Sequence, residues 1–200
     1  MKQNQSETIA FYDRNAREFV EQTSNASMSV MMEAFLKEIP KGCKILDFGC
    51  GSGRDTKAFM DLGYQVTAVD GSRKICEEAS TFTGIAVRQM DFMELEEVDE
   101  YHGIWACASI LHVPYDDLVD LFGKLYRALK QDGILYVSFK YGSFEGMRNE
   151  RYFTDMTMDR LRPILDQVSK LGVLKYWVSA DVRENRGDEQ WLNLIMIKNQ

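Results

Sequence analysis

The stretch Ile45-Leu46-Asp47-Phe48-Gly49-Cys50-Gly51-Ser52-Gly53-Arg54 decides the fold. Its apolar half predicts a buried strand, and the three alternate glycines predict a tight turn into a helix. Glycine permits such a turn and lets a ligand approach the backbone, because it has no Cβ. A dinucleotide fingerprint would need glycine at Arg54, and the G-x-x-x-x-G-K-[ST] spacing of a P-loop is absent. The turn alone fits either a structural strand-helix junction or a ligand site.

Downstream of this turn, short β-rich runs alternate with helical patterns. We expect strands over residues 66–69, 85–87, 103–108 and 134–139, with helices over 72–81 and 118–129 among those between them. Strand and helix in alternation predict parallel pairing with right-handed crossovers. The sequence therefore predicts an α/β fold with helices on both faces of a mostly parallel sheet.

The two ends of the chain depart from this alternation. Two final β-rich runs, 173–178 and 191–197, are joined by a charged segment too short for a crossover, which predicts an antiparallel hairpin. A helix containing Leu161 and Val168 precedes them. Two helices, over 7–22 and 28–39, precede the first strand. No linker divides the chain, so we expect residues 1–200 to form a single domain.

Two further acidic residues follow predicted strands. Asp70 ends the second strand, where a carboxylate can accept both hydroxyls of an unphosphorylated ribose. Asp91 follows the third, where it can accept an adenine amino group beside an apolar wall formed by Phe92. Each Asp alone is more often a helix N-cap or a turn residue. Three such features at the ends of successive strands favour a site for an adenosine without a pyrophosphate.

With these motifs and the segment Cys107-Ala108-Ser109-Ile110-Leu111-His112-Val113, the chain resembles the class I S-adenosylmethionine-dependent methyltransferases, and within them small tellurite-resistance-type and related uncharacterised enzymes. The resemblance implies a Rossmann-like seven-stranded sheet of order 3-2-1-4-5-7-6 with the last strand antiparallel. It implies that helices within residues 1–40 cover the cofactor site, and we expect residues 140–156 to form a substrate-side lid. The cofactor-binding residues it implies are Tyr12, Asp47, Gly49, Cys50, Gly51, Asp70, Gly71, Met90, Asp91, Phe92 and Cys107. Tyr12 fits a helix-face aromatic that packs on the core equally well.

Other residues are candidates for the methyl-acceptor side. His112, just beyond the fourth strand, could act as a general base, although a packing role is the commoner one at such a position. Basic and aromatic residues fall in segments that would border the open end of the site. Charged loop residues usually form a solvated surface, and the alternative here is a pocket for an anionic or oxygen-rich small molecule. These residues are Lys140, Tyr141, Arg151, Arg183 and Trp191.

Composition narrows the function further. The formal net charge of −7 argues against broad contact with nucleic-acid phosphates. The four cysteines lack metal-site or disulfide spacing, so we expect reduced thiols and no metal. A polar N-terminus and the lack of a long apolar run predict a cytoplasmic protein that uses no membrane. We expect a small-molecule methyltransferase, and the alternatives are a protein or RNA methyltransferase and an inactive cofactor-binding regulator.

Overall fold

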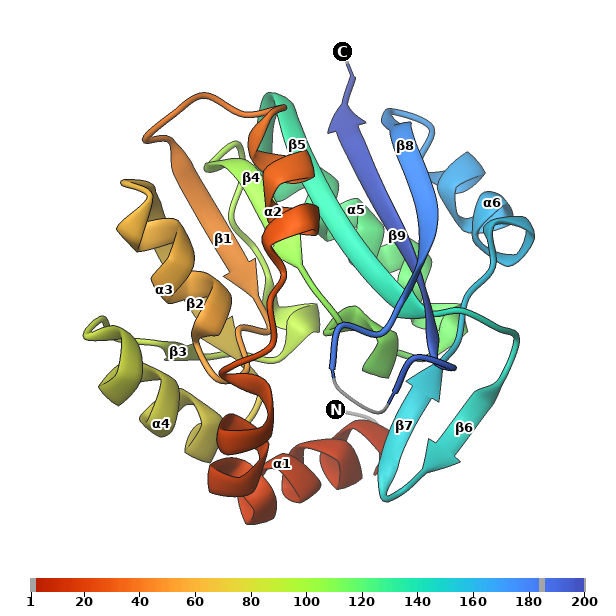
Figure 1. Ribbon diagram of the computed structural model, residues 1–200. Coiled ribbons are helices and arrows are strands. Elements are labelled where there is room, and N and C mark those ends of the chain that lie inside the picture. The colour runs from red at the N-terminus through yellow and green to blue at the C-terminus, as the bar shows by residue number, and fades with distance from the viewer. Residues whose placement is uncertain (1–2, 184–185, 200) are drawn as a thin grey trace.

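One seven-stranded sheet organises the molecule (Figure 1). The computed structural model describes residues 3–183 and 186–199. The strand order is β3-β2-β1-β4-β5-β9-β8, in which β1 to β5 pair in parallel and β9 is antiparallel to both of its neighbours. The predicted order and the terminal hairpin are therefore confirmed, with β8 and β9 as the sixth and seventh strands. The strands are β1 Lys44–Phe48, β2 Gln65–Asp70, β3 Arg88–Gln89, β4 Tyr101–Ala106, β5 Leu129–Lys140, β8 Leu171–Ala180 and β9 Gln190–Lys198.

Helices cover both faces of this sheet. One apolar cluster joins α5 and α6 to one face, and a second joins α2 and α3 to the other around Trp105 and Tyr136, whose rings stack with centroids 4.0 Å apart. Helix α1 lies beneath the carboxyl ends of the strands, beside α4 (Figure 1). The helices are α1 Gln3–Thr23, α2 Ser29–Leu36, α3 Arg54–Asp61, α4 Arg73–Thr83, α5 Leu118–Ala128 and α6 Met158–Gln167, with short 3-10 helices η1 Phe92–Glu94, η2 Ile110–His112 and η3 Tyr115–Asp117.

Two strand predictions were wrong at their boundaries. The third strand occupies Arg88–Gln89 instead of residues 85–87, because the Val87 amide donates to Ser80 Oγ on α4 (2.9 Å) instead of joining the sheet. The fourth strand ends at Ala106, not at residue 108, because Ala108 has a φ of +51° and turns the chain out of the strand direction.

The predicted lid segment, residues 140–156, contains a β-hairpin that the sequence did not predict. Its strands are β6 Glu145–Arg148 and β7 Arg151–Thr154. The two joining residues, Asn149 and Glu150, both have positive φ, as a two-residue hairpin turn with the handedness of the strands requires. β7 packs against α1, so the hairpin and the N-terminal helix together border the carboxyl ends of the strands.

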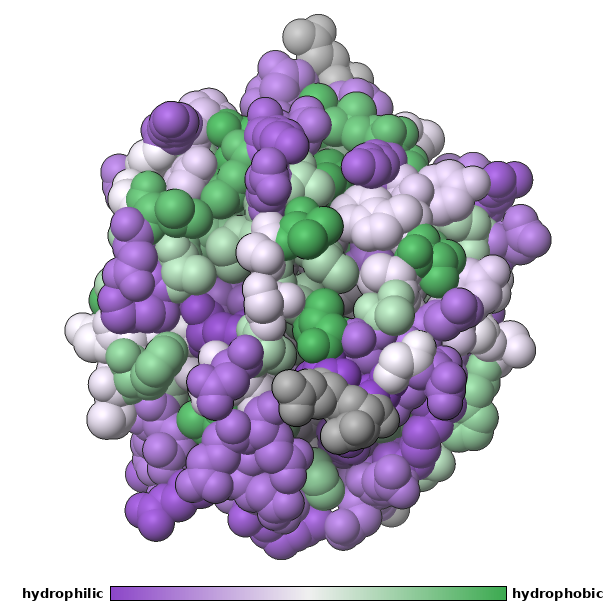
Figure 2. Space-filling view, viewed as in Figure 1, coloured by the Kyte–Doolittle hydropathy of each residue, from purple (hydrophilic) through white to green (hydrophobic). Residues whose placement is uncertain are grey.

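Helix α1 is kinked where Asn15 has non-helical φ and ψ. Its side-chain amide donates to the Phe11 carbonyl (2.8 Å) and so competes with the helical hydrogen bonds. On the face shown in Figure 2, the lower half, where α1 and the hairpin lie, is mostly hydrophilic. Within the described residues, no helix combines the length and the apolar character needed to cross a membrane.

Candidate cofactor and acceptor site

The glycine turn after β1 has a backbone that other residues could not adopt without strain. Gly49, Gly51 and Gly53 have φ values of +84°, +53° and +78°. A Cβ on Gly49 would lie 2.4 Å from the Ser109 Cβ, and one on Gly53 would lie 2.7 Å from a Thr83 methyl. The Gly49 and Cys50 amides both donate to the Val69 carbonyl (2.9 Å), which ties the turn to the end of β2. The backbone is therefore fixed close to whatever occupies the space in front of it.

Asp70 extends from the end of β2 toward this turn. Its carboxylate accepts the Gly51 amide at 3.1 Å and the Ser72 amide at 2.9 Å. Burial raises the pKa of Asp70 to about 6, although these backbone hydrogen bonds oppose the shift. The carboxylate is thus held in one orientation and is ionised at neutral pH.

Asp91 also caps a helix, as a residue in its position usually does. Its Oδ1 accepts the Met93 amide (2.8 Å), and Glu94 accepts the Asp91 amide in return, which completes a capping box on η1. The capping fixes the side chain at the edge of the cavity, and no hydrogen bond to Oδ2 comes from the described residues. The neighbouring Phe92 packs on Phe48 with ring centroids 4.6 Å apart.

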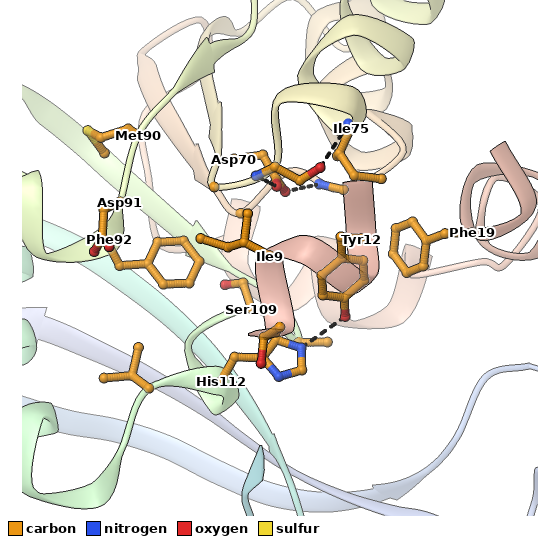
Figure 3. Close-up of a pocket in the computed structure, with 17 residues that line it drawn as sticks. Ile9, Tyr12, Phe19, Asp70, Ile75, Met90, Asp91, Phe92, Ser109 and His112 are labelled. Carbon is orange, nitrogen blue, oxygen red and sulfur yellow. Dashed lines mark hydrogen bonds between the residues drawn. The ribbon is translucent and has the colours of Figure 1, made fainter. Parts of the chain in front are cut away.

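These residues converge on a cavity that we name the Asp70 cavity, drawn in Figure 3. It has a volume of about 700 Å³, its open mouth included, which suits a nucleoside-sized ligand. Helix α1 closes one side with Ile9, Tyr12 and Phe19, and Asp91 and Phe92 lie opposite. The polar groups are few and placed on different elements, as in sites that fix a ligand's orientation.

Tyr12 and His112 separate this cavity from a second one. The Tyr12 hydroxyl lies 2.9 Å from His112 Nε2 (Figure 3). His112 Nδ1 lies 2.5 Å from the Tyr152 carbonyl. Since a carbonyl only accepts, Nδ1 carries the proton and Nε2 accepts from the tyrosine. Burial lowers the pKa of His112 to about 4, and burial raises that of Tyr12. Both groups are neutral at pH 7. The low pKa makes His112 a weak proton acceptor and its Nε2 already accepts from Tyr12, so the geometry does not favour the predicted role of His112 as a general base.

The second cavity, which we name the Arg151 cavity, has a volume of about 1,090 Å³ including its mouth. It shares Tyr12, Phe19 and His112 with the first cavity and extends to the ends of β5, β8 and β9. Five basic residues line it: Arg54, Lys140, Arg151, Arg183 and Arg186.

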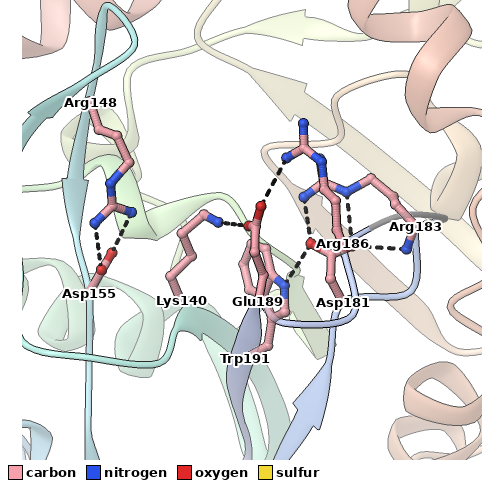
Figure 4. Close-up of polar contacts among 8 residues, drawn as sticks. All are labelled: Lys140, Arg148, Asp155, Asp181, Arg183, Arg186, Glu189 and Trp191. Carbon is pink, nitrogen blue, oxygen red and sulfur yellow. Dashed lines mark hydrogen bonds and ion pairs between the residues drawn. The ribbon is translucent and has the colours of Figure 1, made fainter.

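Acidic neighbours neutralise most of this charge, as Figure 4 shows for the C-terminal part. Arg183 forms a two-pronged contact with Asp181 (2.6 and 2.9 Å), and Trp191 donates to the same carboxylate (3.0 Å). Burial alone would raise the pKa of Asp181, but these hydrogen bonds outweigh it and hold that pKa at about 2. Glu189 pairs with Lys140 and, at 3.6 Å, with Arg186.

At the inner end of the Arg151 cavity lies a buried acidic pair. Asp47 accepts the Thr56 hydroxyl (2.5 Å), and Asp55 accepts two nitrogens of Arg54 and the Trp105 indole N–H (2.9 Å). Burial, with Asp55 nearby, raises the pKa of Asp47 well above its usual range. A cation bound here would lower that pKa again, so the pair suits a positively charged group.

The structure brings all eleven predicted cofactor-binding residues to one or both cavities. Of the predicted acceptor-side residues, Lys140, Arg151, Arg183 and Trp191 line the Arg151 cavity. Tyr141 is 44% exposed, and the structure does not bring it to either cavity. Successive side chains of an extended chain point to opposite sides, and Lys140 takes the inward position.

The sequence reading missed several lining residues. Phe19 borders both cavities and packs on Tyr12 with ring centroids 5.1 Å apart; its place seven residues after Tyr12, on one helix face, was the available signal. Ser109, whose hydroxyl donates to the Phe48 carbonyl (2.6 Å), gave no such signal, because it is positioned by a contact across 61 residues. Arg54 follows the glycine turn directly, but in the sequence it served only to exclude a dinucleotide fingerprint.

Part of the chain is similar in sequence to known methyltransferases. Residues 45–133 match a family model described as a methyltransferase domain. A ubiquinone biosynthesis O-methyltransferase of Xanthomonas oryzae pv. oryzae is 27% identical over 104 residues, which make up 48% of this chain and 43% of that protein. The chain spans less than half the length of the curated relatives that it matches.

Solved structures extend the likeness to the whole fold. A Burkholderia thailandensis 1,6-didemethyltoxoflavin-N1-methyltransferase, with 1,6-didemethyltoxoflavin and S-adenosylhomocysteine bound, is 18% identical with a TM-score of 0.74 over 98% of this chain and 88% of that one. The [4+2]-cyclase SpnF is 14% identical with a TM-score of 0.75 over 98% and 96%. At such identities the likeness shows the fold alone, and a fold shared by a methyltransferase and a cyclase leaves the reaction open.

Proposed function

We propose that this chain is a class I S-adenosylmethionine-dependent methyltransferase, as its motifs predict, and that it binds S-adenosylmethionine and transfers the methyl group to a small molecule. One observation carries the proposal: the glycine turn, Asp70 and Asp91, from three successive strand ends, face one nucleoside-sized cavity. The Arg151 cavity, which shares Tyr12, Phe19 and His112 with it, provides the room for an acceptor.

The residues present fit this cofactor. The oriented Asp70 carboxylate suits a ribose diol, and Asp91 with Phe92 suits an adenine. Asp47 and Asp55 suit a cationic amino group, and Gly49 and Gly51 let the amino-acid part lie against the backbone. When bound, the cofactor supplies an electrophilic methyl group on a sulfonium.

The protein's own contribution to transfer is alignment. In-line displacement needs donor and acceptor held in one orientation and kept from water. Helix α1 supplies Tyr12 and Phe19 as the wall between the cavities, and the β6–β7 hairpin supplies Arg151 and Phe153 on the acceptor side. We infer that residues 140–156 act as the substrate-side lid in this sense, and that α1 covers the cofactor.

The test is binding followed by label transfer. Calorimetry should show that the purified protein binds S-adenosylmethionine and S-adenosylhomocysteine, and each should raise the melting temperature by mass action. With methyl-labelled cofactor and a cell extract, label should enter the small-molecule fraction. Absence of binding at millimolar concentration rejects the proposal. Label in RNA or protein would identify a macromolecular methyltransferase, and binding without any transfer would identify a regulator.

A further inference from the structure

Among the described residues, Arg151 is the one basic side chain of the Arg151 cavity that has no carboxylate partner. Arg54 pairs with Asp55, Arg183 with Asp181, and Lys140 and Arg186 share Glu189. No ion pair or hydrogen bond joins Arg151 to a carboxylate. Its polar partner is the Tyr12 hydroxyl, and its Nε is buried without a hydrogen-bond partner. A buried guanidinium N–H without an acceptor costs free energy that a bound anion would recover.

Two neighbouring elements hold the backbone from which the Arg151 side chain extends. Arg151 begins β7, immediately after the two-residue turn of the hairpin. The next residue, Tyr152, is fixed from two sides: its amide donates to Thr8 Oγ1 on α1 (2.9 Å), and its carbonyl accepts from His112. A side chain placed by two neighbouring elements loses little further entropy when it binds a ligand.

Aromatic rings surround the guanidinium. Its central carbon lies 4.7 Å from the ring centre of Phe11, 5.3 Å from that of Phe153 and 5.9 Å from that of Tyr12. These faces exclude water, so an anion paired with Arg151 would interact more strongly than at an exposed site. They also offer flat apolar walls, which suit a planar ligand body.

We propose that the methyl acceptor is a planar organic anion and that Arg151 binds its anionic oxygen group. This inference rests on the proposed function and names the acceptor class for the same site. The sequence predicted that Lys140 and Arg183 recognise an anion, but acidic partners already match their charges. The inference assigns this recognition to Arg151 instead. The guanidinium's fork of N–H donors matches a carboxylate, so Arg151 sets specificity for acids over their neutral analogues.

The cofactor's own carboxylate is the competing partner for Arg151. The placement of Arg151 argues against it, because Arg151 lies on the β6–β7 hairpin beside Phe11 and Phe153, whereas the glycine turn follows β1. The two partners can be separated with 5′-methylthioadenosine, a nucleoside that lacks the amino-acid part.

The experiment measures probe binding to the protein saturated with S-adenosylhomocysteine. Benzoate and its neutral analogue benzamide are the probes, and calorimetry is the readout. We expect benzoate to bind roughly tenfold or more tightly than benzamide, as one charge-assisted contact implies. Arg151→Met should abolish that difference and leave S-adenosylhomocysteine affinity within about twofold. Arg14→Met removes an exposed charge paired with Glu150, next to Arg151, and should behave as wild type.

Three results would overturn the proposal. Equal binding of the two probes, or no benzoate binding at about 10 mM, would show that the cavity does not select anions. If Arg151→Met weakened S-adenosylhomocysteine but not 5′-methylthioadenosine, the guanidinium would serve the cofactor. Arg151→Lys, which keeps the charge, guards against a folding defect and should retain part of the preference. Loss of all nucleoside binding in the wild type would instead reject the proposed function.

Discussion

The Asp70 cavity and the Arg151 cavity share a wall but are built in different ways. The first is made from short segments at the ends of consecutive strands, where backbone amides of Gly51 and Ser72 hold Asp70. The second is made from side chains far apart in sequence, which position one another by charge: Lys140 with Glu189, for example, across 49 residues. One is a backbone site, and the other is an ion-pair site.

The difference teaches where each cavity tolerates change. A backbone site depends on the absence of side-chain atoms, so an added methyl group at a glycine is severe. An ion-pair site depends on matched charges, so removing one member is felt by the partner left behind. Acceptor specificity can therefore change through a few substitutions near Arg151 without disturbing the Asp70 cavity.

The largest effect should come from adding a single methyl group to the backbone site. Gly49→Ala places a Cβ 2.4 Å from Ser109 at a φ of +84°, so both strain and overlap oppose it. We expect a loss of roughly 2–4 kcal/mol in unfolding free energy and of cofactor binding. Gly63→Ala is the matched control: its φ is +87° but no atom lies within 4 Å, so only about 1 kcal/mol should be lost. Urea unfolding measures both, and equal losses would contradict the close approach.

Removing the Asp70 carboxylate should have the second-largest effect. Asp70→Ala leaves two amides and a ribose without their acceptor, so we expect a loss of about 1–3 kcal/mol in affinity for S-adenosylhomocysteine. Asp91→Ala should cost the same or less, because Phe92 and the backbone remain as contacts for the adenine. Calorimetry on folded variants measures both affinities. Wild-type affinity in Asp70→Ala would remove the ribose assignment.

Local sequence predicted the alternation of strands and helices, the glycine turn and the acids Asp70 and Asp91, because these follow from patterns within a few residues. The strand order and the other cofactor-binding residues came from the family resemblance. The strand ending at Asp47-Phe48 and the glycines after it are adjacent, so their geometry can be inferred without the rest of the chain. The same reasoning failed at residues 85–87, where the Ser80 hydroxyl takes an amide that the strand would have used.

The Arg151 cavity could not be predicted to the same depth. Sequence proximity marked Lys140 and Arg183 as free cations, whereas tertiary pairing with Glu189 and Asp181 neutralises them. The hairpin that carries Arg151 has a polar sequence, and its turn, Asn149-Glu150, lacks the usual Asn-Gly signal. Which of several cations lacks a partner is a property of the folded arrangement.

Substitution of the paired cations should have intermediate effects. We expect Arg183→Ala and Lys140→Ala to lower turnover by roughly tenfold, because each leaves a carboxylate unmatched in the cavity wall, while cofactor affinity stays nearly unchanged. Arg186→Ala, whose 3.6 Å contact is loose and whose side chain is 44% exposed, is the control and should have almost no effect. Steady-state kinetics with an identified acceptor measures these effects. Full turnover in both variants would show that Lys140 and Arg183 belong to a solvated loop surface and have no part in turnover.

The ion pair between Arg183 and Asp181 also predicts that the free energy of unfolding falls at acidic pH. The folded pKa of Asp181, about 2, lies below its ordinary value of 3.8, so its contribution is present above pH 4 and is lost as the pH falls from 4 to 2. Asp181→Asn should therefore flatten the decline of unfolding free energy in that range by about 1–2 kcal/mol. Urea unfolding at several pH values checks this, and an unchanged slope would contradict the ion pair.

The smallest effect on turnover at neutral pH should come from His112, which lies on the wall between the two cavities. With both ring nitrogens engaged and a pKa lowered by burial to about 4, it is a weak proton acceptor near pH 7. His112→Gln should keep turnover within a few-fold, whereas loss of a general base costs roughly 10²–10⁴-fold. Nuclear magnetic resonance titration can follow the protonation of His112 directly, since the chain has only two histidines.

The folded pKa of His112 lies below the ordinary 6.5, so protonation favours the unfolded chain. The stability that His112 contributes is lost as the pH falls from 6.5 to 4. A measured pKa near 6.5, or a thousandfold loss of turnover in His112→Gln, would instead support His112 as the general base.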